Sequence, residues 1–233
     1  MGAIINDLLY RPEWFIPTES VFEIIAMLIT LIISLYSYKV YKLSSNKRYH
    51  YLAVGFFGVA AGFFFKTLSN SVLLYPGLFL GLDKTIPFFK ISYFYTISLI
   101  LYAFLVLSGY VVIACLAANV RNRRTILSLM FIALLAAFLI REARSFTFFY
   151  FFAFVLLVVY IIPYMYENYK KQKNNSSFLV YLGFLLLTLS SLIFIGRSAY
   201  GIYYWAGSYI LGQSVGLLGY LVLLINLVLV LRK

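Results

Sequence analysis

Seven runs of predominantly apolar residues dominate this sequence, at positions 20–42, 50–74, 89–118, 125–142, 146–166, 177–197 and 207–231. A helix that crosses the hydrocarbon core of a bilayer needs about 20 such residues. Only 11% of the 233 residues are charged, against about 25% in soluble domains. The chain cannot cover itself with polar surface, so lipid must be its solvent. We predict an all-α membrane protein in which residues 1–233 form one seven-transmembrane-helix bundle.

Basic residues between the runs predict the orientation of the bundle. Twelve lie on one side: Lys39, Lys42, Lys47, Arg48, Arg121, Arg123, Arg124, Lys170, Lys171, Lys173, Arg232 and Lys233. The other side has seven, offset in its loops by the acids Asp7, Glu13, Glu19 and Asp83. The positive-inside rule makes the first side cytoplasmic, with the N-terminus outside. We expect a multi-pass protein of a plasma membrane, and the sparse acids and aromatic-rich helices suggest a prokaryotic one.

The second run contains a lysine without an acid near it in sequence. Gly58, Gly62, Lys66 and Asn70 are spaced by four, which predicts one shared helix face. We expect this face to pack closely against the first span and Lys66 to pair with Glu23, with Asn70 as a helper. The alternative is that Lys66 extends outward to water or lipid headgroups.

Other spans also carry polar stripes, which are typical of close helix packing with hydrogen-bonded side chains. The stripes comprise Tyr95, Ser98, Tyr102 and Gly109 in the third span, Thr188, Ser190 and Ser191 in the sixth, and Ser208, Gly212, Gln213, Gly216, Gly219 and Asn226 in the seventh. Together they allow a polar cavity in the outer half of the bundle. Arg197 and Trp205 at its outer rim suggest a small apolar or anionic ligand, or an interfacial aromatic belt.

The candidate site follows from these stripes. The predicted ligand-binding residues are Glu23, Lys66, Asn70, Tyr95, Tyr102, Arg197, Trp205 and Gln213. The predicted helix-packing residues are Gly58, Gly62, Gly212 and Gly216.

An internal repeat is the next feature. Residues 38–66 and 166–194 both run through tyrosine, basic residues, serine and asparagine into an apolar helix, and Gly55-Phe56 matches Gly183-Phe184. This register predicts two parallel repeats of three spans, joined by the fourth span, an arrangement known from transporters.

The stretch KLSSNKRYHYLAVGFFGVAAGFFFKTL (42–68) resembles the entry to the second helix of the seven-helix membrane input domains of prokaryotic sensor proteins, including histidine kinases. The resemblance covers the layout of the whole chain, and it implies signal reception without catalytic residues. Those domains usually precede an output domain, whereas this sequence ends at Lys233. We therefore expect a signal to pass to a separate protein.

The numbers of histidine and cysteine residues and the net charge argue against several classes of function. One histidine, His50, and one cysteine, Cys115, argue against a metal or haem site, and we expect neither cofactor nor enzymatic activity. The net charge of +12 sets topology, so we expect no nucleic-acid partner. We rank first a receptor-like sensor or partner-binding subunit, with partner docking at Arg121–Arg124 and Lys170–Lys173, a surface that also attracts anionic lipid. The alternative is a small transporter or channel that uses Glu23 and Lys66.

Overall fold

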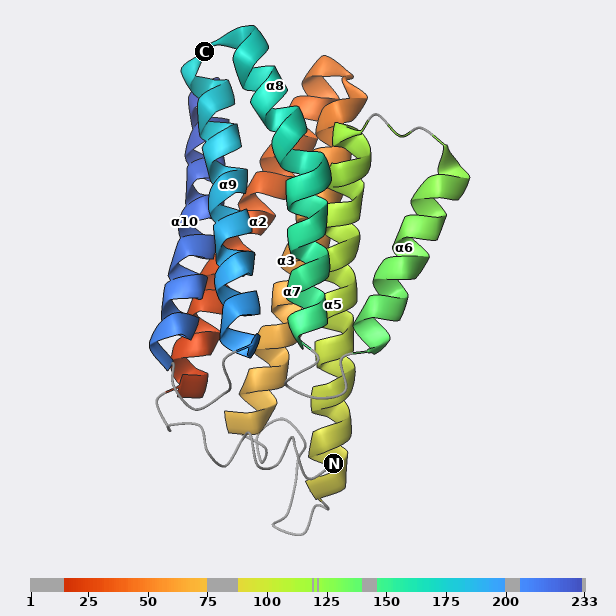
Figure 1. Ribbon diagram of the computed structural model, residues 1–233, viewed down its shortest axis with the longest axis vertical. Coiled ribbons are helices and arrows are strands. Elements are labelled where there is room, and N and C mark those ends of the chain that lie inside the picture. Colours follow the sequence, from red (N-terminus) through yellow and green to blue (C-terminus); the bar gives the residue numbers. More distant parts are fainter. Residues whose placement is uncertain are drawn as a thin grey trace.

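The computed structural model describes residues 15–74, 88–118, 120, 122–139, 146–199 and 206–231, and every regular element within these ranges is a helix. The elements are α2 (Phe15–Ser44), α3 (Lys47–Leu74), α5 (Phe88–Ala117), α6 (Arg123–Phe138), α7 (Phe146–Leu156), the π-helical turn η2 (Leu157–Ile161), α8 (Ile162–Gln172), α9 (Asn175–Ala199) and α10 (Ala206–Leu231). They form a bundle of nearly antiparallel rods (Figure 1).

Six of the helical segments are long and apolar enough to cross a membrane, which identifies a multi-pass membrane bundle. The fourth predicted span is the exception. Helix α6 has 16 residues, about 24 Å at 1.5 Å per residue, whereas the hydrocarbon core is about 30 Å thick. The apolar run was expected to reach residue 142, but α6 ends at Phe138. It packs mainly on α5 and leans away from the other helices (Figure 1).

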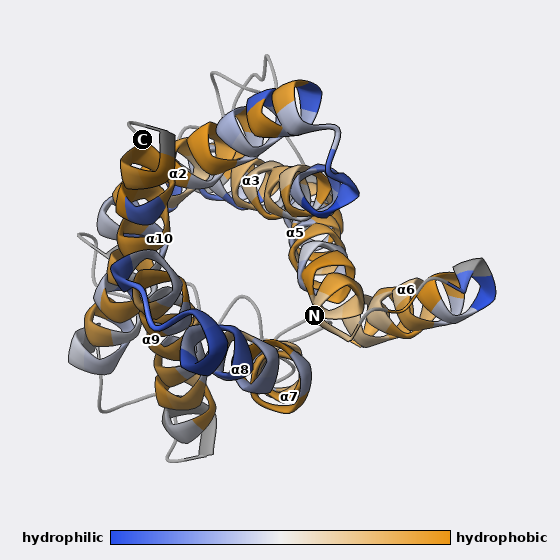
Figure 2. Ribbon diagram, turned by 90° about the horizontal axis from the view of Figure 1, so that it is seen from above, coloured by the Kyte–Doolittle hydropathy of each residue, from blue (hydrophilic) through white to orange (hydrophobic). Residues whose placement is uncertain are grey.

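The remaining helices form a closed ring. Neighbours around it are α2, α3, α5, α7, α9 and α10, and α10 returns to α2 (Figure 2). Helix α8 continues α7 beyond η2 and packs on α9. The ring encloses an apolar and aromatic core that includes Val59, Leu107 and Leu157.

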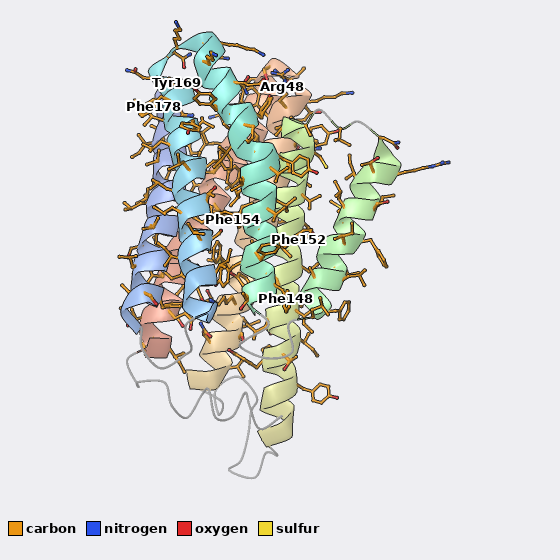
Figure 3. All side chains as sticks on the ribbon, viewed as in Figure 1. Arg48, Phe148, Phe152, Phe154, Tyr169 and Phe178 are labelled. Carbon is orange, nitrogen blue, oxygen red and sulfur yellow. The ribbon has the colours of Figure 1, made fainter. Side chains whose placement is uncertain are left out.

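The two ends of the ring differ in charge. The turns between α2 and α3, between α5 and α6 and between α8 and α9 meet at one end, which we call the basic end, where Arg48 and Tyr169 are labelled in Figure 3. Hydrophilic residues concentrate there (Figure 2). The first turns of α2 and α10 lie at the opposite end (Figure 1).

The fifth span bends where its hydrogen-bond ladder is interrupted. Pro163 has no backbone N–H, so an α-helical bond to the carbonyl of Val159 cannot form. The N–H of Ile162 instead donates to Leu157 O, which closes a π-helical turn. Proline accounts for η2 at this place, because such turns absorb a broken ladder without ending the helix.

The glycine face of α3 packs against α5, and the expectation that it packs against the first span is wrong. A Cβ added to Gly62 would lie 3.0 Å from Tyr102 O and 2.6 Å from Val106 Cγ2, and one added to Gly58 would lie 3.1 Å from Leu105 O. A spacing of four advances about 40° per step beyond a full turn of a 3.6-residue helix. Over three steps, from Gly58 to Asn70, this drift separates the glycines from Lys66 and Asn70, which face α2.

Candidate functional site

One face of α2 carries its polar side chains into the bundle. Glu23 and Thr30 are 0% exposed, and Ser34 and Ser37 are also buried. The hydroxyl of Ser34 donates to Ala53 O of α3 at 2.8 Å, and Thr30 donates to Ala26 O within its own helix. These four polar side chains share one face of the helix, and this face directs Glu23 toward α3.

Lys66 is the centre of a buried ionic cluster. Its Nζ lies 2.7 Å from Glu19 Oε1 and 2.7 Å from Glu23 Oε1. Asn70 Nδ2 donates to the other oxygen of Glu23 at 3.0 Å. Lys66 is 5% exposed and Glu19 4%, so neither reaches solvent. The predicted pairing of Lys66 with Glu23 and Asn70 is therefore confirmed, and outward extension of Lys66 is excluded.

Helix α10 completes the cluster with Tyr209. Its hydroxyl donates to Glu19 Oε1 and accepts from Lys66 Nζ at 3.2 Å. Gln213, one turn further along, donates to the same hydroxyl at 2.8 Å. The Lys66 ammonium also lies 5.3 Å from the ring centroid of Tyr102 and 5.7 Å from that of Tyr209, within the range of cation–π attraction. Residues of the first, second, third and last spans therefore meet around the Lys66 ammonium.

Sequence reasoning missed Glu19 and Tyr209. Glu19 was assigned to a loop as an acid that offsets basic residues, but α2 begins at Phe15 and buries it. The available signal was its position four residues before Glu23, since that spacing places both carboxylates on the same side of a helix. Tyr209 stood among other tyrosines, and no local pattern distinguished it.

A cavity of about 50 Å³ lies inside the ring, beside this cluster. Its lining comprises Ala26, Phe63, Tyr102, Val106, Tyr110, Phe149, Tyr150, Ala153, Leu187, Ser190, Ser191, Phe194, Gln213, Gly216, Leu217 and Tyr220. One water centre needs about 10–15 Å³, so the space suits a few waters or a small ligand. The hydroxyls of Tyr110 and Tyr220 share a hydrogen bond of 2.8 Å in its wall.

The cavity and the ionic cluster share two walls. Gln213 and Tyr102 both line the cavity, and each also contacts the cluster, through Tyr209 and through Lys66 respectively. Phe194 stacks on Tyr150 with ring centroids 4.4 Å apart and meets Tyr209 edge-on at 5.6 Å. The side chain of Tyr102 therefore touches both the cavity and the Lys66 ammonium.

The remaining predicted site residues divide into three groups. Tyr102 and Gln213 line the cavity, and Gly216 joins them, while Gly212 packs against the ring of Phe194. Tyr95 is buried on α5 but is not part of the cavity wall. Trp205 and the side chain of Arg197 lie outside the described residues.

The basic end carries exposed cations. Arg124, Lys170, Lys171 and Lys173 are exposed, and Lys171 Nζ is 3.8 Å from Glu167 Oε2. Arg121 and the side chain of Arg123 lie outside the described part of the chain. Within that part, no group of three or more His, Cys, Asp or Glu side chains is placed to hold a metal ion.

Comparison with known proteins adds no relative, because no protein-family model, no curated protein and no solved structure matches the chain.

Proposed function

We propose that this protein is a receptor-like membrane module that binds a small ligand in the central cavity and passes the bound state to a separate protein. The observation that carries the proposal is that the cavity is shared by all six long helical segments. They contribute Ala26 (α2), Phe63 (α3), Tyr102 (α5), Ala153 (α7), Phe194 (α9) and Gln213 (α10). Because a ligand there contacts every helix of the ring, differential contacts can shift the packing of the whole bundle.

The proposed orientation has the N-terminus outside and the basic end in the cytoplasm of a plasma membrane, by the positive-inside rule. The exposed Lys170, Lys171 and Lys173 lie at that end. They and Arg124 form the surface that we propose for a cytoplasmic partner or for anionic lipid. The resemblance to membrane input domains of sensor proteins supports the same arrangement, in which the bundle binds the ligand and a separate protein responds.

Native mass spectrometry of the protein, extracted gently from its own membrane, tests this function. We expect a bound small molecule together with a stoichiometric second polypeptide. The variant Ala153→Leu, which fills the cavity, should lose the small molecule, while Ala118→Leu at an exposed position should keep it. A protein that carries only bulk lipid and no partner would contradict the receptor-like function.

A transporter is the second candidate, and a two-fold repeat of the ring supports it. The register that aligns 38–66 with 166–194 in the sequence also pairs Ser45 of the α2–α3 turn with Lys173 of the α8–α9 turn. Both residues are left-handed, with φ of 53° and 48°. Their N–H groups donate to Tyr41 O and Tyr169 O, both at 2.8 Å. The two turns are therefore built in the same way.

The close helix contacts follow the same plan. An added Cβ at Gly109 would lie 2.5 Å from Gly55 O, and one at Gly219 would lie 2.9 Å from Gly183 O. Gly55 and Gly183 are partners in the register of the turns. Each half of the ring is thus joined by one pair of closely approaching glycines, between α3 and α5 and between α9 and α10.

Tyr110 and Tyr220 lie where the two halves of the ring meet. They directly follow Gly109 and Gly219 in the sequence, and they share a hydrogen bond in the cavity wall. Residues related by a two-fold axis touch each other only on that axis, so this pair supports an axis that passes through the cavity. Transporters built from parallel repeats bind substrate at such an interface and rock one repeat against the other.

Uptake into liposomes separates the two candidates. A transporter should move a bound small molecule down its gradient at a rate that Ala153→Leu abolishes and Ala118→Leu leaves unchanged. Saturable binding without flux would reject transport and leave the receptor-like function standing.

A further inference from the structure

We propose that the central cavity takes a small neutral polyhydroxy compound, of about the size of glycerol, as its ligand. This inference rests on the proposed ligand-binding function and names the class of ligand. It differs from the apolar or anionic ligand that the sequence suggested, and it follows from the charge, the hydrogen-bonding groups and the size of the cavity.

The described wall of the cavity carries no charge. Of the described residues that line it, none is Asp, Glu, Lys, Arg or His. Lys66 and the two carboxylates that it contacts, Glu19 and Glu23, are not part of the lining. A charged ligand would exchange water for a wall without a counter-charge, which is costly in a site that hydrocarbon surrounds. The wall therefore favours a neutral ligand.

Tyrosine hydroxyls and one amide offer hydrogen-bond donors to the cavity. The Tyr102 hydroxyl makes no hydrogen bond within the described residues, although Tyr102 is only 4% exposed. Tyr110 and Tyr220 share one hydrogen bond of 2.8 Å, which uses only one of their two O–H protons. The amide nitrogen of Gln213 donates one N–H to Tyr209 and keeps the other. A buried donor without a partner is costly, so these groups favour a ligand that accepts hydrogen bonds.

Hydrogen-bond acceptors lie in the same wall. Ser190 donates its hydroxyl proton to Gly212 O at 2.8 Å, and its oxygen keeps its lone pairs. Ser191 does the same with Leu187 O at 3.1 Å. The carbonyl oxygen of Gln213 accepts no hydrogen bond from a described residue. A hydroxyl group donates and accepts at one atom, so a ligand with several hydroxyls can pair with both sets, whereas an apolar ligand would leave both unpaired.

The size of the cavity limits the ligand. A volume of about 50 Å³ holds about four waters, since one water centre needs about 10–15 Å³. Glycerol has about the bulk of four liquid water molecules, whereas a hexose is larger. The rings of Phe63, Phe149 and Phe194 also line the cavity, and they offer apolar surface on which the C–H groups of a carbon skeleton pack. A three-carbon polyol combines these features.

Glycerol binding to the full-length protein in lipid nanodiscs tests the proposal, measured by ligand-observed NMR against empty nanodiscs. We expect saturable binding of glycerol. 1-Propanol has the same carbon skeleton with a single hydroxyl, and it should bind about tenfold more weakly because it leaves groups of the wall unpaired. Serinol carries an ammonium in place of one hydroxyl, and glycerate carries a carboxylate in place of one hydroxymethyl group. Both should bind more weakly than glycerol, because each brings a charge to an uncharged wall.

Two variants of α9 test whether glycerol binds in this cavity. Ser191 and Thr188 both donate to a carbonyl four residues earlier, at 3.1 and 2.9 Å, but of the two only Ser191 lines the cavity. Ser191→Ala should weaken glycerol binding about two- to tenfold, because it removes one acceptor from the wall. Thr188→Val loses an equivalent hydroxyl outside the lining and should bind as the unmodified protein does. Equal affinities of the two variants would contradict binding in this cavity.

Absence of saturable glycerol binding would overturn the polyol assignment, as would tighter binding of serinol, glycerate or 1-propanol than of glycerol. Native mass spectrometry of the protein from its own membrane then distinguishes the two failures. A bound small molecule of another chemistry leaves the ligand-binding function standing, whereas bulk lipid alone and no partner contradicts that function as well. The measurements on the unmodified protein decide the question even if a variant does not fold.

Discussion

The two halves of the ring have similar packing but different chemistry. In the register that aligns 38–66 with 166–194, Lys66 of α3 corresponds to Phe194 of α9. Both side chains approach Tyr209: the Lys66 ammonium lies 5.7 Å from its ring centroid, and the Phe194 ring 5.6 Å. At this matched position, one half places a charge and its counter-ions beside Tyr209. The other half places an aromatic stack there. Glycine contacts and turns are similar in the two halves, while single residues at matched positions differ in charge.

The largest effect should come from Lys66→Met, because it removes the ammonium that two buried carboxylates contact. We expect a loss of about 3–5 kcal/mol in the free energy of unfolding in detergent. Phe194→Met, the matched change in the other half, should cost about 1–2 kcal/mol, since it removes ring contacts without exposing a charge. Equal losses would contradict the difference between the halves.

Variants that combine changes at Lys66, Glu23 and Glu19 test whether these buried charges act together. Adding Glu23→Gln to Lys66→Met should recover part of the loss, and adding Glu19→Gln as well should recover more, because each change removes one buried charge that Lys66 had balanced. Strictly additive losses would show that the ion pairs do not contribute as a cluster.

The glycine contacts should be the next most sensitive feature, and both halves should respond alike. Gly109→Ala would bring a methyl group within 2.5 Å of Gly55 O, and Gly219→Ala within 2.9 Å of Gly183 O. Backbone atoms cannot move aside cheaply, so we expect each change to lower the free energy of unfolding by about 1–3 kcal/mol.

Gly196→Ala is the control, since its methyl group would meet nothing within 4 Å. Thermal unfolding of the three variants side by side is the measurement. If one glycine contact tolerated the methyl group and the other did not, the result would contradict the proposed repeat of the two halves.

Apolar length and helix periodicity predicted most of the fold. Within the described residues, the seven runs correspond to seven helical segments, and Lys66 forms the expected ion pair with Glu23. The direction of the glycine face was not predictable from spacing alone, because a drift of about 40° per four residues accumulates over the helix. Glu19 was missed for a different reason: Pro17, Thr18 and Ser20 flank it, so the apolar run begins only at residue 20, whereas the helix begins at Phe15.

The hydrogen bond between Tyr110 and Tyr220 joins the two halves, and its loss should have a smaller effect. Tyr110→Phe or Tyr220→Phe should each cost about 0.5–1.5 kcal/mol. The double change should cost little more than one of them, because the second substitution removes a hydroxyl that has already lost its partner. Additive losses in thermal unfolding would mean that each hydroxyl bonds elsewhere, and the support for an axis at this pair would disappear.

The smallest effect should come from Glu23→Gln, and its size decides how the charged half is balanced. The change leaves Glu19 to neutralise Lys66. The new amide turns its oxygen to the Lys66 ammonium and its N–H2 to Asn70, whose own amide turns over to present its oxygen. We expect a change in the free energy of unfolding of less than about 1 kcal/mol, because the ion pair of Glu19 with Lys66 is retained.

Asn70→Leu provides the contrast to Glu23→Gln, because it removes a donor that contacts the carboxylate at 3.0 Å and should cost about 1–3 kcal/mol. Chemical unfolding at neutral pH compares the two variants. If Glu23→Gln were the more damaging, the charge of Glu23, and not only that of Glu19, would be needed to balance Lys66.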